Sequence, residues 1–177
     1  MYTLNAQKVD AGRQDPVKPL PYTEEEVAFE NQAAGIRLAG SLTIPSGAGP
    51  FPAVVLIPKA GLLDRDERML NHRPFLVLAD YLTRAGIAVL RTDVRGVGKS
   101  GGKYAGAQAA DFAAGAGSAM EYLRTRKEVN AGRIGLISHG EGGRAAGIAA
   151  VRNRAAFVVM LGAAAVPQAA NSVEAAA

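Results

Sequence analysis

The chain has 177 residues, of which 49% are hydrophobic and 20% charged, and its formal net charge is +4. This composition is ordinary for a soluble globular protein, and the length suits one domain with a substantial core. The absence of cysteine excludes disulfides, thiolate metal sites and a cysteine nucleophile. Basic and acidic residues are interspersed and no aromatic residues accompany a basic stripe, so we expect no nucleic-acid partner.

The N-terminal segment carries no hydrophobic period. It holds three prolines after residue 15 among polar residues, so we expect residues 1–21 to be an extended or disordered lead-in. It also lacks the apolar stretch of a signal peptide. The longest apolar run, residues 155–166, is shorter than the roughly 20 residues that a membrane helix needs. The sequence therefore predicts no membrane partner and a cytoplasmic location, an expectation that a removed leader would change.

Two kinds of strand pattern follow the lead-in. Residues 26–30 and 36–44 alternate polar and apolar side chains, which predicts an antiparallel pair joined around Gly35. Four later runs are continuously apolar, as in parallel strands covered on both faces, and they span residues 53–57, 87–90, 134–137 and 157–161.

Helical patterns separate these apolar runs. Apolar residues recur at helical spacing behind Pro74 and again further along the chain, at Phe75, Leu78, Ala79 and Leu82 and at Phe112, Ala116, Ala119 and Leu123. A helix of small residues is expected from about Gly142 to Asn153.

The order of elements predicts a three-layer α/β/α sandwich. Its sheet is expected to be mostly parallel, with about six strands including the antiparallel N-terminal pair. We assign this domain to residues 22–166 and an alanine-rich tail to residues 167–177. Ligands of such sheets bind outside the carboxyl ends of the strands, where residues 58–67, 93–102 and 138–143 fall.

The segment Asp93–Ser100, DVRGVGKS, ends in the Gly-Lys-Ser of a phosphate-binding loop. That loop requires a glycine where Asp93 stands, and a helix should open at Lys99, whereas two glycines follow Ser100. We therefore keep a nucleotide-binding protein only as a third hypothesis. The favoured interpretation is that Asp93, Arg95 and the glycines fix a tight loop through local hydrogen bonds.

Three further groups of polar residues admit structural interpretations. The cluster of residues 64–67, DRDE, suits surface salt bridges or loop ordering better than a metal site. His72 precedes a helix and is expected to be structural or solvated. His139 is expected to pack or to bond locally, and it cannot serve as base for Ser138, because successive strand side chains point to opposite faces.

Together these motifs resemble one family. Residues 52–58 with the DRDE cluster, the D-x-R-G-x-G-x-S segment of residues 93–100 and the H-x-E-G-G segment of residues 139–143 are similar to bacterial serine hydrolases of the α/β-hydrolase superfamily. Within that superfamily the chain is similar to dienelactone-hydrolase-like and prolyl-oligopeptidase-like esterases and peptidases. The resemblance spans about residues 22 to 163.

The resemblance implies a nucleophile elbow, G-x-S-x-G, on a strained turn between a strand and a helix. Gly140 then occupies the nucleophile position, with Ser138 and Gly142 at the flanking positions and His139 in between. The backbone N–H groups of Ala60 and Glu141 become the candidate oxyanion-hole donors. The resemblance also implies a small-molecule ester or peptide substrate, no cofactor and no metal.

Several residues depart from the family pattern. The serine is absent at Gly140, Ser138 replaces a glycine, and Lys59 stands where the oxyanion loop usually has a small residue. No Asp or His follows Gly140. Because loss of a triad member costs on the order of 10⁴ to 10⁶ in rate, we expect a truncated and catalytically impaired serine ester or peptide hydrolase. The alternative is a non-catalytic binding scaffold, which could form a homo-oligomer through an exposed edge strand at residues 157–161.

Overall fold

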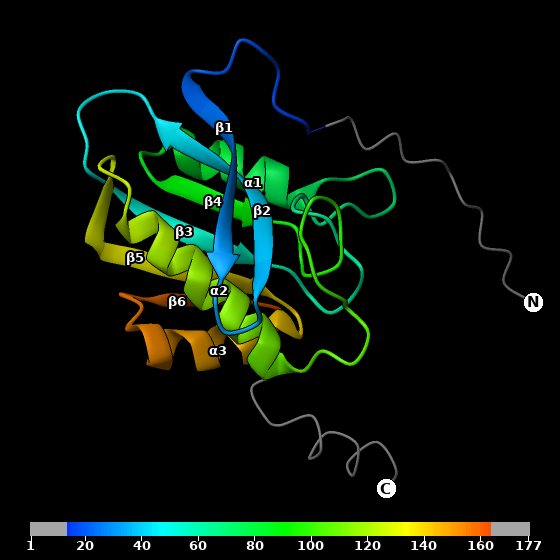
Figure 1. Cartoon of the computed structure of the whole chain (residues 1–177). Helices are drawn as coiled ribbons and strands as arrows, with labels where there is room; N and C mark the ends of the chain where they lie inside the picture. The colour runs from blue at the N-terminus through cyan, green and yellow to red at the C-terminus, as the bar shows by residue number, and fades with distance from the viewer. Residues whose placement is uncertain (1–13, 164–177) are drawn as a thin grey trace, which may run out of the picture.

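The computed structural model describes residues 14–163, which form six strands and three helices in the order that the sequence predicts (Figure 1). The elements are β1 (Tyr22–Asn31), β2 (Ile36–Pro45), β3 (Phe51–Ile57), α1 (Pro74–Arg84), β4 (Ala88–Thr92), α2 (Ala109–Arg124), β5 (Val129–His139), α3 (Gly142–Asn153) and β6 (Val158–Leu161).

The strands form one mixed sheet in the order β1-β2-β4-β3-β5-β6. The first two strands pair in antiparallel fashion around the turn at Gly35, and β2 also runs antiparallel to β4. The pairs β3–β4, β3–β5 and β5–β6 are parallel. The predicted mostly parallel sheet with an antiparallel N-terminal pair is therefore confirmed.

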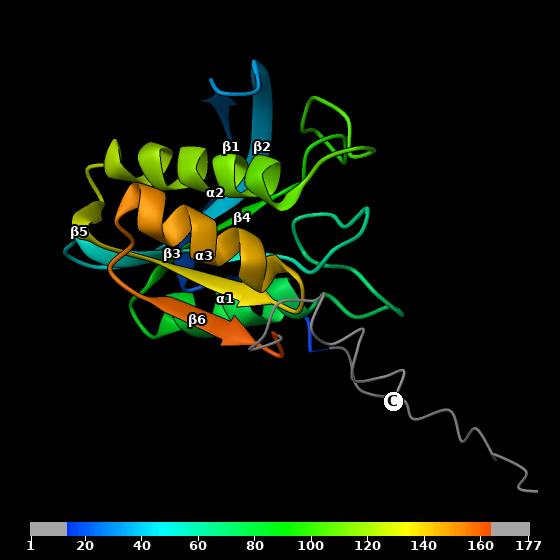
Figure 2. The same cartoon turned by 90° about the horizontal axis from the view of Figure 1, so that it is seen from below.

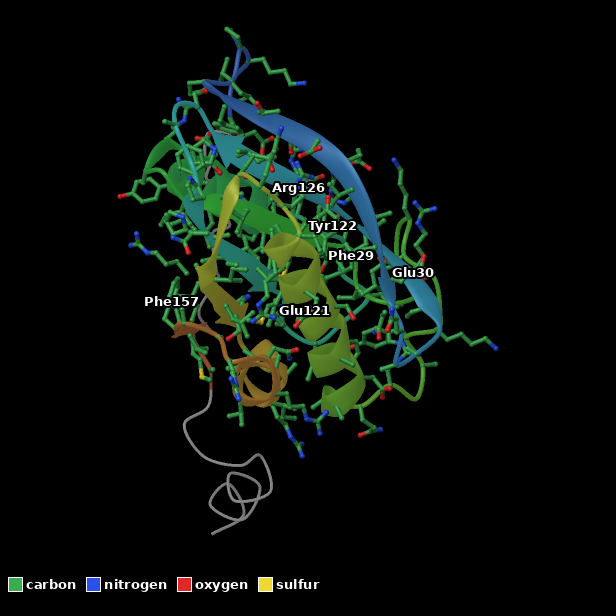
Figure 3. The ribbon with its side chains drawn as sticks, turned by 60° about the vertical axis from the view of Figure 1, so that its left-hand side comes forward. Phe29, Glu30, Glu121, Tyr122, Arg126 and Phe157 are labelled. Atoms are coloured by element: carbon green, nitrogen blue, oxygen red, sulfur yellow. The ribbon has the colours of Figure 1, made fainter. Side chains whose placement is uncertain are left out.

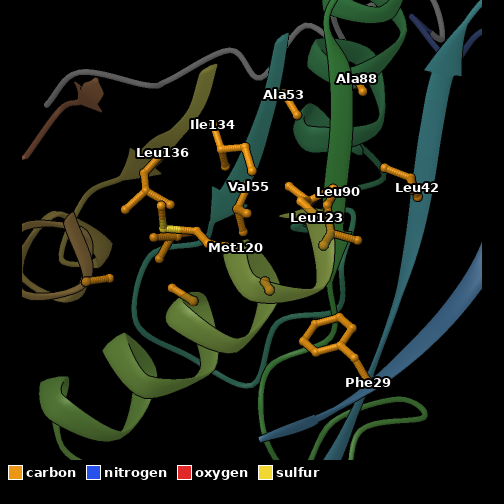
Figure 4. Close-up of a cluster of buried hydrophobic side chains, with 14 of the residues drawn as sticks. Phe29, Leu42, Ala53, Val55, Ala88, Leu90, Met120, Leu123, Ile134 and Leu136 are labelled. Atoms are coloured by element: carbon orange, nitrogen blue, oxygen red, sulfur yellow. The ribbon is translucent and has the colours of Figure 1, made fainter. Parts of the chain in front are cut away.

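Helices cover both faces of the sheet, which confirms the three layers. Figure 2 shows α2 and α3 on one face and α1 on the other. The larger apolar cluster lies on the α2 and α3 side and contains Val55, Leu90, Met120 and Leu136 (Figure 4). A smaller cluster around Phe75 packs α1 against the opposite face. The apolar runs of β3, β4 and β5 are buried between the layers, as the sequence predicted. The run in β6 was also expected to be covered on both faces, but this strand lies at the edge of the sheet and is largely exposed.

Strand β2 departs from its alternating pattern, because every residue from Leu38 to Pro45 is buried. It lies inside the sheet between β1 and β4, so both of its faces are covered. The polar side chains of this strand find internal partners; Thr43 Oγ1, for example, lies 2.6 Å from Thr83 Oγ1 of α1. An alternating sequence therefore does not mark a solvent-facing strand here.

Contacts with β1 fix the C-terminal half of α2. The rings of Phe29 and Tyr122 stack with centroids 5.2 Å apart, and Arg126 donates to the Tyr122 hydroxyl at 2.8 Å (Figure 3). Arg126 also pairs with Glu25 at 2.6 Å. These contacts hold the C-terminal end of α2 against β1.

The predicted lead-in lies within the described residues only from position 14 onward. Residues 14–21 contain no helix or strand, and hydrogen bonds hold them to the domain. Arg73 donates to Asp15 from Nη2 at 2.6 Å and from Nε at 3.1 Å, and Ser46 Oγ donates to the Pro21 carbonyl at 2.7 Å. The predicted tail of residues 167–177 lies outside the described part. Within residues 14–163, none of the helices combines the length and apolar character needed to cross a membrane.

Candidate active site

Two neighbouring strands at the centre of the sheet, β3 and β5, are followed by helices on opposite faces of the sheet. After β3 the chain continues to α1 on one face, whereas after β5 it enters α3 on the other face (Figure 2). Loops that diverge in this way leave a crevice at the carboxyl ends of the two strands, the usual ligand position in open α/β sheets. Residues 58–60 and residues 140–142 form the two sides of this crevice.

The turn after β5 has the geometry of an elbow. Gly140 adopts a φ of +51°, a left-handed conformation that L side chains rarely adopt. A Cβ at Gly142 would lie 2.4 Å from the Pro58 carbonyl oxygen, so only glycine allows α3 to begin this close to β3. The strained turn at 140 and the crowding at 142 are therefore present without a serine.

Lys59 adjoins the nucleophile position. A Cβ built on Gly140 would lie 3.1 Å from the Lys59 Cβ, which is tighter than ordinary van der Waals contact. The Lys59 ammonium group points elsewhere and lies 3.4 Å from the Met69 sulfur. The side chain of Lys59 thus crowds position 140 through its first carbon, and not through its charge.

The two candidate oxyanion donors border one cavity. Ala60 and Glu141 both line a space of about 1110 Å³ together with Gly140. Within residues 14–163, neither the Ala60 nor the Glu141 backbone N–H donates a hydrogen bond. Glu141 also precedes the first residue of α3, where the helix dipole favours negative charge. Each of these N–H groups can donate to a carbonyl oxygen or an oxyanion in the cavity.

Ser138 and His139 do not border this cavity. The Ser138 side chain is fully buried, and its hydroxyl has no hydrogen-bond partner among the described residues. His139 Nδ1 lies 2.8 Å from Glu67 Oε1, so its partner is 72 residues away in sequence. The expectation of a local bond for His139 was wrong, whereas His72 is exposed, as the sequence predicted.

Glu67 corrects the prediction of a surface charge cluster at residues 64–67. This side chain is 1% exposed and also accepts the Lys59 backbone N–H at 3.0 Å. The cluster does order its loop, as expected, but Glu67 does so from the interior.

Asp93 organises the loop after β4. Its carboxylate accepts the backbone N–H of Lys99 at 3.1 Å and of Arg65 at 3.0 Å, and it pairs with Arg65 Nη2 at 2.7 Å. Burial raises the pKa of Asp93, but the Arg65 guanidinium and the two backbone donors outweigh it and hold the pKa below its ordinary value. No helix begins at Lys99, because α2 starts at Ala109. The prediction that Asp93 fixes a tight loop is confirmed. Its ion pair with Arg65, which is distant in the sequence, was not predicted.

Arg95 lines the cavity, but its side chain forms an ion pair outside its own loop. Its Nη1 pairs with Asp111 of α2 at 3.1 Å, so the local hydrogen bonds expected for Arg95 were wrong. Sequence reasoning also missed Arg65 as the partner of Asp93, and it missed Asn31, which lines the cavity from the end of β1. The only signal for Arg65 was its place in the charge cluster, and nothing in the sequence distinguished Asn31.

Comparisons with known proteins agree with this geometry. Residues 4–166 match the esterase FrsA-like family. The esterase EstD of Thermotoga maritima is 30% identical over 161 residues, which are 91% of this chain but only 37% of EstD. The chain thus spans little more than a third of that relative's length.

Solved structures share the architecture. The α/β hydrolase GrgF from Penicillium sp. sh18 matches with a TM-score of 0.67 and 25% identity, over 78% of this chain and 45% of GrgF. A dienelactone hydrolase from Anabaena variabilis has the same fold, with a TM-score of 0.64 and 20% identity over 81% of this chain and 64% of its own. The chain belongs to the esterase FrsA-like family, within the α/β-hydrolase superfamily.

Proposed function

We propose that this chain binds small esters at the elbow cavity and does not hydrolyse them through a serine triad. One observation carries the proposal: Gly140 has the left-handed turn of an elbow and no side chain to act as nucleophile, and the N–H donors beside it have no acceptor within residues 14–163. The esterase relatives support an ester over other carbonyl compounds.

The chemistry separates binding from turnover. Oxyanion donors alone supply at most about 10³ in rate, and Ser138 cannot replace the missing nucleophile because it is buried away from the cavity. His139 bonds to Glu67 and does not border the cavity, so it cannot act as base for a ligand there. Ester binding therefore persists while acyl transfer does not.

Binding is tested with methyl octanoate, followed by chemical-shift changes and isothermal titration. Ala60→Trp blocks the cavity at an exposed lining residue, and Tyr81→Trp is the control at a position on α1 that is 71% exposed. We expect Ala60→Trp to abolish binding and Tyr81→Trp to leave it unchanged. Equal binding by both variants, or no binding by the parent chain, would contradict the proposal.

Turnover is tested with p-nitrophenyl acetate and butyrate, for the parent chain beside Ser138→Ala and His139→Ala. We expect either no activity above the solution rate or a trace that both variants keep. Turnover that one variant abolishes would show that a displaced nucleophile or base is at work.

Self-association through β6 is a second candidate function. Within the described residues, β6 pairs only with β5, and its side chains Val159, Met160 and Leu161 are 40–49% exposed. A second copy could extend the sheet there. Sedimentation velocity at micromolar concentration tests this: Val159→Lys should shift an oligomer to monomer, whereas Val151→Lys, at an 83% exposed position on α3, should not. A parent chain that is monomeric would refute the idea.

A further inference from the structure

Two residues that line the elbow cavity, Asn31 and Arg95, each carry a buried hydrogen-bond donor that has no partner among the described residues. Asn31 is 1% exposed, and its Nδ2 has no acceptor among residues 14–163. The other is Arg95 Nε, which is also buried and without an acceptor in that part of the chain, although the whole side chain is 19% exposed. Most buried donors in proteins are hydrogen-bonded, so these two require an explanation.

The orientations of both donors are set by their other contacts. Asn31 Oδ1 accepts the Ala34 backbone N–H at 3.3 Å, which turns the amide nitrogen away from the turn. Arg95 Nη1 pairs with Asp111, whose other carboxylate oxygen accepts the Gln108 N–H at 2.8 Å at the start of α2. Neither donor can reorient without breaking one of these bonds.

Asn31 and Arg95 both adjoin the same face of helix α2. Arg95 contacts α2 at Asp111, and a Cβ built on Gly115 would lie 4.0 Å from Asn31 Nδ2. Asp111 and Gly115 are four residues apart, so they share one helix face at a spacing of about 6 Å. Both residues line the cavity, and the missing side chain of Gly115 leaves room beside Asn31.

The surroundings of the donors define what they can bind. Apolar side chains of Leu38, Phe112 and Ala116 line this part of the cavity. An apolar ligand chain fits them, but an unpaired amide N–H and a guanidinium N–H each need an oxygen acceptor.

We propose that Asn31 and Arg95 form a subsite of hydrogen-bond donors, which binds a carbonyl or carboxylate oxygen at the far end of an ester's acyl chain. This inference rests on the proposed function, in which the ester group itself lies against Ala60 and Glu141. The preferred ligands are therefore esters of keto acids or monoesters of dicarboxylic acids, and not esters of simple fatty acids. A cavity of about 1110 Å³ is large enough for such a two-ended ligand.

The test uses methyl esters of matched size that differ only at the far end: methyl octanoate, methyl 7-oxooctanoate and monomethyl pimelate. The same comparison is repeated with methyl hexanoate, methyl 5-oxohexanoate and monomethyl glutarate, because the two lengths place the far oxygen differently. Dissociation constants are measured by isothermal titration for the parent chain and for Asn31→Asp and Arg95→Lys.

Each variant removes one donor and can keep one local contact. Asn31→Asp retains the oxygen that accepts the Ala34 N–H, and Arg95→Lys retains a positive charge opposite Asp111. Asn130→Asp is the matched control, because Asn130 Oδ1 likewise accepts a backbone N–H, from Gly132 at 3.1 Å, and does not line the cavity. Thermal unfolding checks that each variant folds.

We expect the oxygen-bearing ester of at least one length to bind about tenfold more tightly than the plain ester. Each donor variant should reduce that preference below about threefold, and Asn130→Asp should keep it. A preference for the keto ester alone assigns a carbonyl, and a preference for the monoester alone assigns a carboxylate.

Two results would overturn the subsite, and they differ in what they imply. If all esters bind equally well at both lengths, the two donors take no part in ligand binding and the proposed function stands without the subsite. If no ester binds at all, the subsite and the proposed function fail together.

Discussion

Glu67 Oε1 and His139 Nδ1 lie 2.8 Å apart, and this contact joins the loop after β3 to the end of β5. The same carboxylate accepts the Lys59 N–H at 3.0 Å. Lys59 precedes Ala60, and His139 lies two residues before Glu141, so one buried side chain holds both segments that carry the candidate oxyanion donors. Glu67 therefore sets the width of the crevice between them.

Replacement of Glu67 should loosen this crevice. We expect Glu67→Ala to lower the free energy of unfolding by about 3 kcal/mol, because it leaves His139 and the Lys59 N–H without their acceptor. Urea denaturation measures the change, and Arg68→Ala, with a side chain 61% exposed on the same loop, should cost less than about 0.5 kcal/mol. Equal effects of the two substitutions would show that Glu67 does not organise the loop.

The beginning and the middle of α3 should respond in opposite ways to alanine. Gly142→Ala places a Cβ 2.4 Å from the Pro58 carbonyl oxygen, so we expect a loss of about 3 kcal/mol or failure to fold. Gly147 lies in the same helix with nothing within 4 Å of an added Cβ, and Gly147→Ala should stabilise by about 0.5–1 kcal/mol. The pair is compared by urea denaturation. If Gly147→Ala also destabilises the protein, alanine is unfavourable throughout α3, and the loss at Gly142 cannot be assigned to the contact with Pro58.

The sequence predicts the fold well because its patterns are local. Continuous apolar runs identify the buried strands, helical spacing behind Pro74 identifies α1, and a run of small residues identifies α3. The glycines around position 140 likewise mark the elbow, since a strained turn and close packing both require them.

The contacts within the site could not be predicted in the same way. Glu67 meets His139 across 72 residues, Arg65 reaches Asp93 across 28, and Arg95 leaves its loop for α2. These partners depend on which loops the sheet order brings together, and no spacing in the sequence encodes that order. Asn31 is an extreme case, because an asparagine at the end of a strand ordinarily indicates only a turn.

The pairing of Asp93 with Arg65 should make stability depend on acid. Because the pKa of Asp93 is held below its unfolded value, the ionised form contributes stability above about pH 4, which is lost as the pH falls through the folded-state pKa. Asp93→Asn should lower the free energy of unfolding at pH 7 and flatten its decline below about pH 4. Urea denaturation at these pH values measures both effects.

Glu121→Gln is the control for this prediction, because that carboxylate is 64% exposed. Its curve should run close to that of the parent chain. If the Asp93→Asn curve runs parallel to the parent curve down to low pH, the carboxylate is not the group responsible for acid sensitivity.

The contact between Lys59 and position 140 predicts a non-additive pair. Gly140→Ala should cost about 1–2 kcal/mol for the left-handed backbone, plus a crowding cost, because the new Cβ would lie 3.1 Å from the Lys59 Cβ. Lys59→Gly removes that carbon, whereas Lys59→Ala keeps it. A double-mutant cycle should therefore show a favourable coupling of at least about 0.5 kcal/mol with Lys59→Gly and none with Lys59→Ala. Strict additivity in both cycles would show that the Lys59 side chain moves away from the new Cβ without an energetic cost. The expected coupling would instead mean that a side chain at the nucleophile position requires a smaller residue at 59, so Gly140 and Lys59 fit each other as a pair.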